Sequence, residues 1–313
     1  MRLKLTGNKK KIAIFGSTGN IGKNISMYFS AENEFDLVLF GRNEKKVEKI
    51  MNKIMNNSKY LFHNYNEFDN NNYDVVINCI GISDPQIISK NNKILEITEK
   101  YDNKILDYIK RKKDTTYVNF SSGAVYGQSF ESPIKESSLC KLNINKLDQN
   151  NSYQISKINS ELKHRKFNDL NIIDLRIFNF FSRFTDLKSK FLMSQISNAL
   201  KHNKEFLTDK NNIIRDYIHP EDLFKIIKIC IKKRKINDSF DVKSKKTISK
   251  FQLLKILNKK YGLNYIIQNL EHSSPTGIKM KYYSKSKKIE HLGLVPKYTS
   301  INAILTELNY IMD

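Results

Sequence analysis

Cysteine, glycine, proline and tryptophan are scarce or absent in this 313-residue chain, and long apolar runs are missing. Its three cysteines, Cys79, Cys140 and Cys230, share no close spacing, which excludes a disulfide framework and a zinc site. Eleven glycines and five prolines exclude collagen-like or linker-dominated sequence. No apolar run reaches the roughly 18 residues of a membrane span, and the run after the charged start is too short for a signal peptide. We therefore expect a globular, cytoplasmic protein without a metal centre.

Acidic residues are also few relative to basic ones. The chain has 54 Lys and Arg against 32 Asp and Glu, a formal net charge of +22. Such a charge raises the question of nucleic-acid binding. However, the lysines are spread along the whole chain, with no basic tail and no recognisable nucleic-acid module. We predict a solvated, lysine-rich surface whose field attracts an anionic substrate such as a nucleotide diphosphate.

Apolar runs alternate with amphipathic segments along the chain. Strands are expected at 11–15, 36–40, 60–62, 74–80, 116–120 and 172–178. Helices are expected at 23–31, 43–55, 87–112, 152–167, 187–202, 219–233 and 250–261, with a last short element at 285–292. Strands alternating with helices predict an α/β protein with a parallel sheet covered on both faces. The order of elements matches a doubly wound sheet of the Rossmann type.

A glycine motif joins the first strand to the first helix. It has the form GxxGxxG and consists of Gly16, Ser17, Thr18, Gly19, Asn20, Ile21 and Gly22. Glycines at these positions allow a tight turn and a close approach of the backbone to a pyrophosphate, which the helix N-terminus then binds. The strand–turn–helix context makes a dinucleotide site the favoured interpretation over a helix-packing glycine cluster.

The end of the second strand indicates which dinucleotide is bound. An acidic residue there would bind the ribose 2′-hydroxyl of NAD, whereas an arginine accommodates the 2′-phosphate of NADP. The sequence has Gly41, Arg42 and Asn43 at this point and no acid. Because the planar guanidinium of Arg42 suits a phosphate, we predict NADP, with NAD as the alternative.

Three polar residues could supply the chemistry. Tyr153 and Lys157 are four positions apart on one helix and so share a face. A nearby ammonium favours the phenolate and lowers the pKa of a tyrosine, which can then act as an acid–base. Ser122 follows the fifth strand, where ligands gather in open α/β sheets. Together these residues are typical of hydride transfer at a carbinol carbon, for which a nicotinamide carries the hydride.

At this point the sequence resembles the extended short-chain dehydrogenase/reductase family, which contains nucleotide-sugar epimerases, dehydratases and reductases. The matching segments are GSTGNIG (16–22), VVINCIG (75–81), NFSSGAVYG (119–127), YQISK (153–157), DLRIFNFF (174–181) and RDYIHPEDL (215–223). A C-terminal segment, 281–300, resembles the family's closing strand, helix and proline. The resemblance covers essentially the whole chain.

The resemblance implies a role for each matching residue. Ser122, Tyr153 and Lys157 fall on the catalytic residues; the last two are also implied cofactor contacts, and Lys157 would bind the nicotinamide ribose. Cofactor contacts are implied for the glycine motif, for Gly41, Arg42 and Asn43, and for Cys79, Ile80 and Gly81. Substrate contacts are implied for Ser122, Gly123, Tyr126, Asn179 and Arg215, the last of which would hold a nucleotide diphosphate.

Departures from the family pattern narrow the chemistry. The 4,6-dehydratases of the family place an acid pair where this chain has Gly123 and Ala124, so a dehydratase is not expected. Ala124 also replaces a cysteine that a double epimerisation would need. The loop after the third strand lacks an obvious match to the family's adenine-contacting aspartate, for which Asp69 is the candidate.

Three functions remain open. We favour an NADP-dependent reductase of a nucleotide-linked keto-sugar, with Tyr153 as proton donor, and the resemblance implies a role in surface-polysaccharide precursor synthesis. A nucleotide-sugar 4-epimerase with tightly bound NAD is the alternative, and a non-catalytic NADP-binding regulator is third. The retention of Ser122, Tyr153 and Lys157 favours an enzyme.

The expected architecture has two parts with the active site between them. A dinucleotide-binding domain is expected from 1–178 plus 213–242, and a smaller C-terminal α/β substrate-binding domain from 179–212 plus 243–313. The resemblance also implies a homodimer, formed through the long helix at 87–112 and the Tyr153 helix. An apolar stripe on the long helix has the composition for such an interface, or for the core (Ile94, Ile97, Ile105, Leu106 and Ile109).

Overall fold

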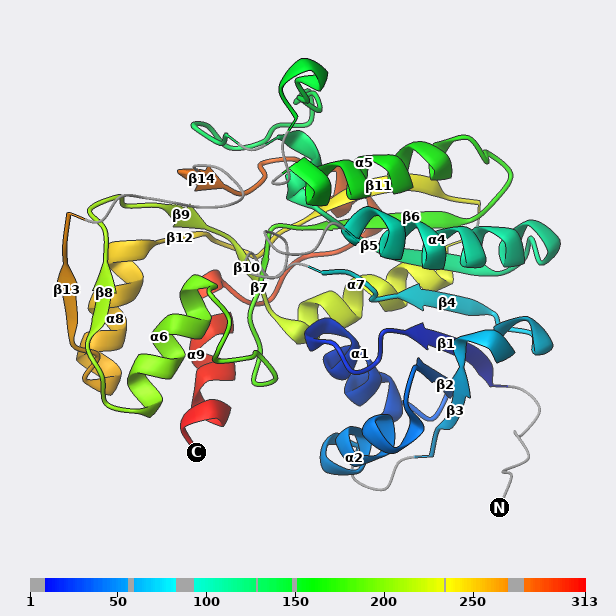
Figure 1. Ribbon diagram of the computed structural model, residues 1–313, viewed down its shortest axis with the longest axis horizontal. Helices are drawn as coiled ribbons and strands as arrows, with labels where there is room; N and C mark the ends of the chain where they lie inside the picture. Colours follow the sequence, from blue (N-terminus) through cyan, green and yellow to red (C-terminus); the bar gives the residue numbers. More distant parts are fainter. Residues whose placement is uncertain are drawn as a thin grey trace.

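A computed structural model describes the chain at residues 9–55, 59–82, 93–127, 129–147, 151–233, 235–269 and 279–313. Its main feature is a seven-stranded sheet in the order β11-β6-β5-β4-β1-β2-β3, in which every neighbouring pair is parallel (Figure 1). The order reverses at β1, as a doubly wound sheet requires, and confirms the predicted fold.

The strands and helices of this layer follow the predicted alternation, except that the edge strand at 237–242 is not among the expected strands. The strands are β1 (Lys10–Phe15), β2 (Phe35–Gly41), β3 (Leu61–Asn64), β4 (Val75–Asn78), β5 (Thr116–Ser122), β6 (Ile172–Ile177) and β11 (Asn237–Val242). The helices are α1 (Asn20–Ser30), α2 (Glu44–Ile54), α4 (Ile94–Arg111), α5 (Ser152–Arg165) and α7 (Pro220–Lys232). Short 3₁₀ turns follow β3 (η1, Tyr65–Asn70) and β5 (η2, Gly123–Tyr126), and a third (η3, Ile144–Lys146) precedes α5. The predicted helix at 87–112 begins partly outside the described residues.

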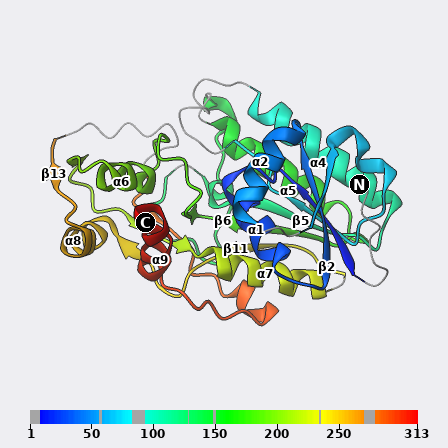
Figure 2. The same ribbon diagram turned by 90° about the horizontal axis from the view of Figure 1, so that it is seen from below.

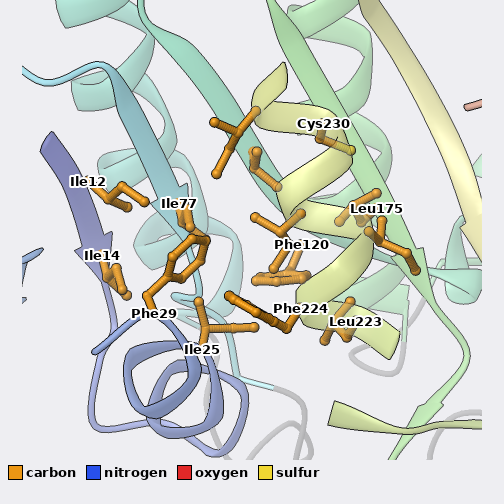
Figure 3. Packing of buried hydrophobic residues seen from close by; sticks show 14 of the residues in the cluster. Ile12, Ile14, Ile25, Phe29, Ile77, Phe120, Leu175, Leu223, Phe224 and Cys230 are labelled. Carbon is orange, nitrogen blue, oxygen red and sulfur yellow. The ribbon is translucent and has the colours of Figure 1, made fainter. Parts of the chain in front are cut away.

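Helices α1, α2 and α7 cover one face of the sheet, and α4 and α5 cover the other (Figure 1). On the first face, the Phe29 ring of α1 meets the Phe224 ring of α7 edge to face at 4.9 Å, above the apolar side chains of the central strands (Figure 3). Two residues stabilise the N-terminus of α7: Pro220 occupies its first turn, and the His219 side chain accepts a hydrogen bond from the Glu221 N–H.

Most of the apolar stripe of α4 belongs to the core, and Ile97 of the predicted stripe is half-buried. Ile94, Ile105, Leu106 and Ile109 are at most 3% exposed, and the last three pack against strands of the sheet. Of the two interpretations that the sequence left open for this stripe, the structure supports the core. The homodimer remains a prediction, and the apolar stripe of α4 does not support it.

A second group of elements has its own hydrophobic core beside the sheet (Figure 2). Its helices are α6 (Leu192–Lys201), α8 (Lys250–Tyr261) and α9 (Ser300–Met312). Its short strands are β7 (Asn179–Phe180), β8 (Phe206–Thr208), β9 (Ile214–Arg215), β10 (Tyr217–Ile218), β12 (Ile248–Ser249), β13 (Tyr265–Ile267) and β14 (Lys281–Tyr282). The element predicted at 285–292 is a 3₁₀ helix, η5 (Lys288–Leu292). No helix in the described part of the chain is long and apolar enough to cross a membrane.

Candidate active site

The glycine motif forms a turn that tolerates no larger residues. Gly16 has a φ of +71°, and the Gly19 N–H donates to its carbonyl oxygen at 3.0 Å. A Cβ on Gly22 would lie 2.2 Å from that same oxygen, and a Cβ on Gly16 would lie 3.0 Å from the Cys79 backbone. The positive φ of Gly16 and the hydrogen bond from Gly19 form the turn. The short distance from Gly16 to the Cys79 backbone shows that the turn lies directly against the end of β4.

The N-terminus of α1 is suited to an anion. Its N-cap is Gly19, so no side chain caps the first N–H groups, and its first turn holds no acidic residue. Free N–H groups and the positive end of the helix dipole favour phosphate there. The Asn20 side chain has a structural role. It accepts a hydrogen bond from Ser182 at 2.5 Å and donates one to Thr185 at 3.1 Å, which connects α1 to the loop after β7. Ser17 donates to the Phe40 carbonyl oxygen at 3.2 Å.

The predicted cofactor residues at the tip of β2 differ in exposure. Gly41 is buried, and a Cβ there would lie 2.7 Å from the Val47 side chain. Asn43 caps α2 by accepting from the Lys46 N–H at 2.9 Å. Arg42 between them is exposed. Of the three, Arg42 has the side chain that is available to a ligand.

Tyr65 is a neighbour of the glycine turn that the sequence analysis missed. Its hydroxyl accepts from the Gly16 N–H at 3.3 Å, and its ring packs on Phe15 and Tyr101. Burial raises the pKa of Tyr65 to about 12, while the Gly16 N–H and the Arg42 charge oppose the shift. The signal for it was its place directly after the third strand.

Asp69, the candidate for an adenine contact, is engaged elsewhere. Its carboxylate accepts from Lys104 at 2.9 Å and from Arg111 at 2.5 Å, both on α4. The geometry therefore gives Asp69 a surface ion-pair role.

The end of β4 connects the glycine turn to the catalytic residues. The Cys79 N–H donates to the Phe15 carbonyl oxygen at 2.9 Å, which holds β4 beside β1. Two residues on, a Cβ at Gly81 would lie 3.5 Å from Lys157 Nζ. Burial raises the pKa of the Cys79 thiol, so it stays protonated and acts as a packing residue. The structure thus brings the predicted cofactor segment 79–81 against both the glycine motif and Lys157.

Ser122, Tyr153 and Lys157 converge at the end of β5. Ser122 is 5% exposed and caps η2 by accepting from the Ala124 N–H at 3.2 Å. Lys157 Nζ donates to the Phe120 carbonyl oxygen at 2.9 Å and lies 5.8 Å from the centre of the Tyr153 ring. The three residues that the sequence singled out for chemistry therefore form one cluster.

Burial opposes the formation of charge on both titratable groups of this cluster. Burial raises the pKa of Tyr153, and a hydrogen bond with Ser122 opposes that shift. Burial lowers the pKa of Lys157, although the carboxylates of Asp102 and Asp174 act against it. Tyr153 therefore holds its proton at neutral pH, as a proton donor must.

The predicted substrate residues lie around the same cluster but are held by different contacts. Gly123 is required by packing, since a Cβ there would lie 2.6 Å from the Phe178 ring. The Asn179 amide donates to a backbone carbonyl at 3.1 Å. Arg215 donates to the Lys279 carbonyl oxygen at 2.5 Å.

Tyr126 has the most constrained side chain of this predicted set. Its hydroxyl bonds Asp241 at 2.9 Å and Arg176 at 2.6 Å. Any substrate contact from Tyr126 must therefore use another part of the residue.

Tyr282 is the second residue that the sequence analysis missed. It lies on β14, and its hydroxyl is 3.3 Å from Ser122 Oγ. The two residues are 160 positions apart, and no motif links them. Only the folded chain reveals the contact.

A separate ion network occupies the C-terminal half of α5. His164 is fully buried and bonds Asp174 at 2.9 Å through Nδ1 and Asp102 at 2.8 Å through Nε2. These carboxylates raise the pKa of His164 to about 9 against the effect of burial. Lys163 and Arg165 each add an ion pair to one of the two aspartates.

Comparisons with known proteins agree with this geometry. The family model described as "NAD dependent epimerase/dehydratase family" matches residues 12–242. A search of curated proteins gave no match. Among solved structures, the chain is similar to a UDP-glucose 4-epimerase from Thermotoga maritima with UDP-glucose, at 15% identity and a TM-score of 0.80, covering 96% of this chain and 98% of that one.

Two further structures have the same fold. A UDP-glucuronic acid 4-epimerase from Bacillus cereus, in complex with UDP-glucuronic acid and NAD, is 16% identical with a TM-score of 0.78 over 96% of this chain and 98% of that one. An ADP-L-glycero-D-manno-heptose-6-epimerase from Helicobacter pylori is 18% identical with a TM-score of 0.79 over 97% and 96%. At these identities the likeness shows the fold.

Proposed function

The chain belongs to the NAD dependent epimerase/dehydratase family, an enzyme family of the extended short-chain dehydrogenase/reductase type, and from that premise we propose that it is an NADP-dependent reductase of a nucleotide-linked keto-sugar. The observation that carries the proposal is the cluster of Ser122, Tyr153 and Lys157 beside Gly81 and the glycine turn. A proton donor and a cofactor-binding turn are thus adjacent, as a carbonyl reduction requires.

The residues around the glycine turn fit a dinucleotide. A Cβ at Gly22 would fill the turn, and the uncapped N-terminus of α1 offers N–H groups to a pyrophosphate. Arg42, exposed at the tip of β2, would hold a 2′-phosphate. When bound, the nicotinamide supplies the hydride.

The residues of the chain would move the proton and hold the substrate. Tyr153 gives its proton to the oxygen that the reduction leaves negative, and Ser122 donates a hydrogen bond to the same oxygen. Lys157, buried with a single carbonyl acceptor among the described residues, places a positive charge near the Tyr153 ring and stabilises the phenolate that remains.

The proposed substrate is a nucleotide sugar. Arg215 would hold the diphosphate, and the similar structures from Thermotoga maritima and Bacillus cereus were solved with UDP-sugars. The sugar would lie between a dinucleotide-binding domain at 1–178 plus 213–242 and a substrate-binding domain at 179–212 plus 243–313. Asn179 begins β7, just after β6 of the central sheet, and Arg215 ends β9, which pairs with β12 and β14.

A nucleotide-sugar 4-epimerase with bound NAD is the second candidate. It is favoured by the epimerases among the similar structures, several of which hold NAD. Ser122, Tyr153 and Lys157 serve either reaction, because an epimerase oxidises and then reduces the same carbon. Arg42 in place of an acid favours the reductase.

The test is a titration of purified, nucleotide-stripped protein with NADPH and NADH, followed by cofactor fluorescence. We expect a preference for NADPH that the Arg42→Ala variant loses, and retention of that preference in Lys45→Ala, a matched loss of a nearby exposed charge. Nucleotide 4-keto-sugars are then screened for NADPH oxidation. Tightly held NAD with no NADPH preference would make the epimerase the better interpretation, and isomer exchange without net absorbance change would establish it.

A further inference from the structure

Tyr282 brings a phenol from the C-terminal part of the chain to the catalytic serine. Its strand, β14, pairs with β9, which carries Arg215. Its hydroxyl lies 3.3 Å from Ser122 Oγ, and its side chain is 5% exposed. Among the described residues, Ser122 is the one hydrogen-bond partner of this hydroxyl, so the bond accounts for a polar group that would otherwise be buried without one.

The hydrogen bonds around Ser122 limit where its own proton can point. A serine hydroxyl has one proton and two acceptor lone pairs. The Ala124 N–H already donates to Ser122 Oγ at 3.2 Å. If Tyr282 donates as well, both lone pairs are used. The single Ser122 proton is then left for Tyr153 or for a substrate oxygen.

Tyr282 is well held for such a role. Its ring packs between Phe130 at 4.8 Å and Phe178 at 5.0 Å, measured between ring centres. Lys279 Nζ lies 4.6 Å from the ring centre, and the Arg215 guanidinium lies 6.0 Å from it. Burial raises the pKa of Tyr282, against the opposing effects of the hydrogen bond with Ser122 and the Arg215 charge, so the phenol keeps its proton.

We propose that Tyr282 is a positioning residue, which donates its hydrogen bond to Ser122 and thereby directs the Ser122 proton toward Tyr153 and the reacting oxygen. The proposal rests on the proposed function for its kinetic consequence, but the hydrogen bonds themselves do not. It means that the catalytic serine is oriented from β14, beside the arginine proposed to hold the diphosphate. The substrate-side elements thus complete the proton-transfer site.

The direct test measures the pKa of Tyr153 by NMR of protein labelled at tyrosine Cζ, with the resonance assigned by Tyr153→Phe. In Tyr282→Phe the ring and its packing remain, but the donor to Ser122 is lost. Since this hydrogen bond helps to direct the Ser122 proton toward the Tyr153 oxygen, we expect the Tyr153 pKa to rise by roughly half a unit when it is lost. Tyr283→Phe, at the next position along the chain, should leave it unchanged.

The kinetic test uses the substrate found under the proposed function. We expect Tyr282→Phe to lower kcat about 5-fold with little change in KM, because the lost bond acts in proton transfer. The basic limb of the pH profile should move upward together with the Tyr153 pKa. In a Ser122→Ala background, Tyr282→Phe should add no further loss, since its effect passes through Ser122.

Several results would overturn the inference. An unchanged Tyr153 pKa in Tyr282→Phe, or an equal shift in Tyr283→Phe, would remove the positioning role. So would a raised KM with unchanged kcat, or a full further loss in the Ser122→Ala background. If the wild-type protein turns over no nucleotide sugar, the proposed function fails, and the NMR titration still decides the inference by itself.

Discussion

Helix α5 carries two buried cations whose surroundings are opposite. His164, in its C-terminal half, lies between two carboxylates at 2.8 and 2.9 Å, and they raise its pKa to about 9. Lys157, in its N-terminal half, donates to one backbone carbonyl oxygen, and burial lowers its pKa. Both ring nitrogens of His164 have carboxylate partners, whereas Lys157 Nζ has one hydrogen-bond acceptor among the described residues and can donate to others.

This difference separates stability from function. A buried charge is tolerated when it is paired and hydrogen-bonded, and removing one partner then costs several kcal/mol. An incompletely paired buried cation destabilises the free protein and is stabilised when a ligand supplies the missing acceptors. We therefore expect the His164 network to govern folding and the cluster around Lys157 to govern turnover.

The largest expected effect is that of Tyr153→Phe on turnover. Without the Tyr153 phenol the group proposed to give the proton is lost, and kcat should fall about 10³-fold, since general acid–base catalysis contributes on that order. The unfolding midpoint in urea and the affinity for NADPH should stay close to the wild-type values. Turnover within a few-fold of wild type would contradict the assignment of Tyr153.

The second effect is on stability. His164→Leu leaves Asp102 and Asp174 buried without their shared partner, although Lys163 and Arg165 still pair with them. We expect the free energy of unfolding in urea to fall by about 3 kcal/mol, the lower end for a broken buried ion pair. His202→Leu, at an exposed histidine, is the control and should cost less than about 0.5 kcal/mol. A loss below about 1 kcal/mol in His164→Leu would show that the network is dispensable for folding.

The third effect is a dependence of stability on pH. The pKa of His164 is raised from 6.5 to about 9 in the folded protein, so its contribution is fully present below pH 6.5 and is lost as the pH rises through about 9. Unfolding free energy should therefore decline between these values by an amount on the order of 3 kcal/mol. Urea titrations at pH 6.5, 8 and 9.5 measure it. His164→Gln, which cannot titrate, should show a flatter profile, and equal slopes in the two proteins would assign the decline to other groups.

Much of the fold and half of the site followed from local patterns. Buried parallel strands are short apolar runs in the sequence, and a turn such as that at Gly16 and Gly22 requires glycine at fixed positions. Both features can therefore be recognised from the sequence alone. Ser122 could be found because it ends a strand, and Tyr153 and Lys157 because a spacing of four positions places them on one face of a helix. Their individual roles remain predictions.

The rest depends on contacts between distant segments. Tyr282 reaches Ser122 across 160 positions, and Tyr126 meets Asp241 across 115. The pairing of β14 with β9, which creates the first contact, involves two residues from each strand and gives no periodic signal. The element predicted at 285–292 is a short 3₁₀ helix. Its apolar residues Ile289 and Leu292 are three positions apart, a spacing that one turn of an α-helix or of a 3₁₀ helix can produce, so the sequence could not distinguish the two types.

The smallest expected effect on stability is that of Asp69, whose exposed ion pairs can be compared with the buried network of His164. Like the aspartates beside His164, it pairs with two cations, Lys104 and Arg111. The Asp69 side chain is 37% exposed and that of Arg111 is 61% exposed, against 0% for His164 and 1% for Asp102. Water and salt screen such pairs, so Asp69→Asn should lower the free energy of unfolding by less than about 1 kcal/mol, and the loss should shrink in high salt.

The same variant tests the cofactor site. With its carboxylate held by α4, Asp69 should not contribute to NADPH affinity, and Asp69→Asn should bind NADPH as the wild type does in the fluorescence titration. A tenfold weaker affinity of this variant for NADPH would instead support the predicted contact between Asp69 and the adenine. A stability loss near 3 kcal/mol would show that the number of ion pairs, rather than their burial, sets the strength of these networks, and would remove the distinction between the two ends of α5.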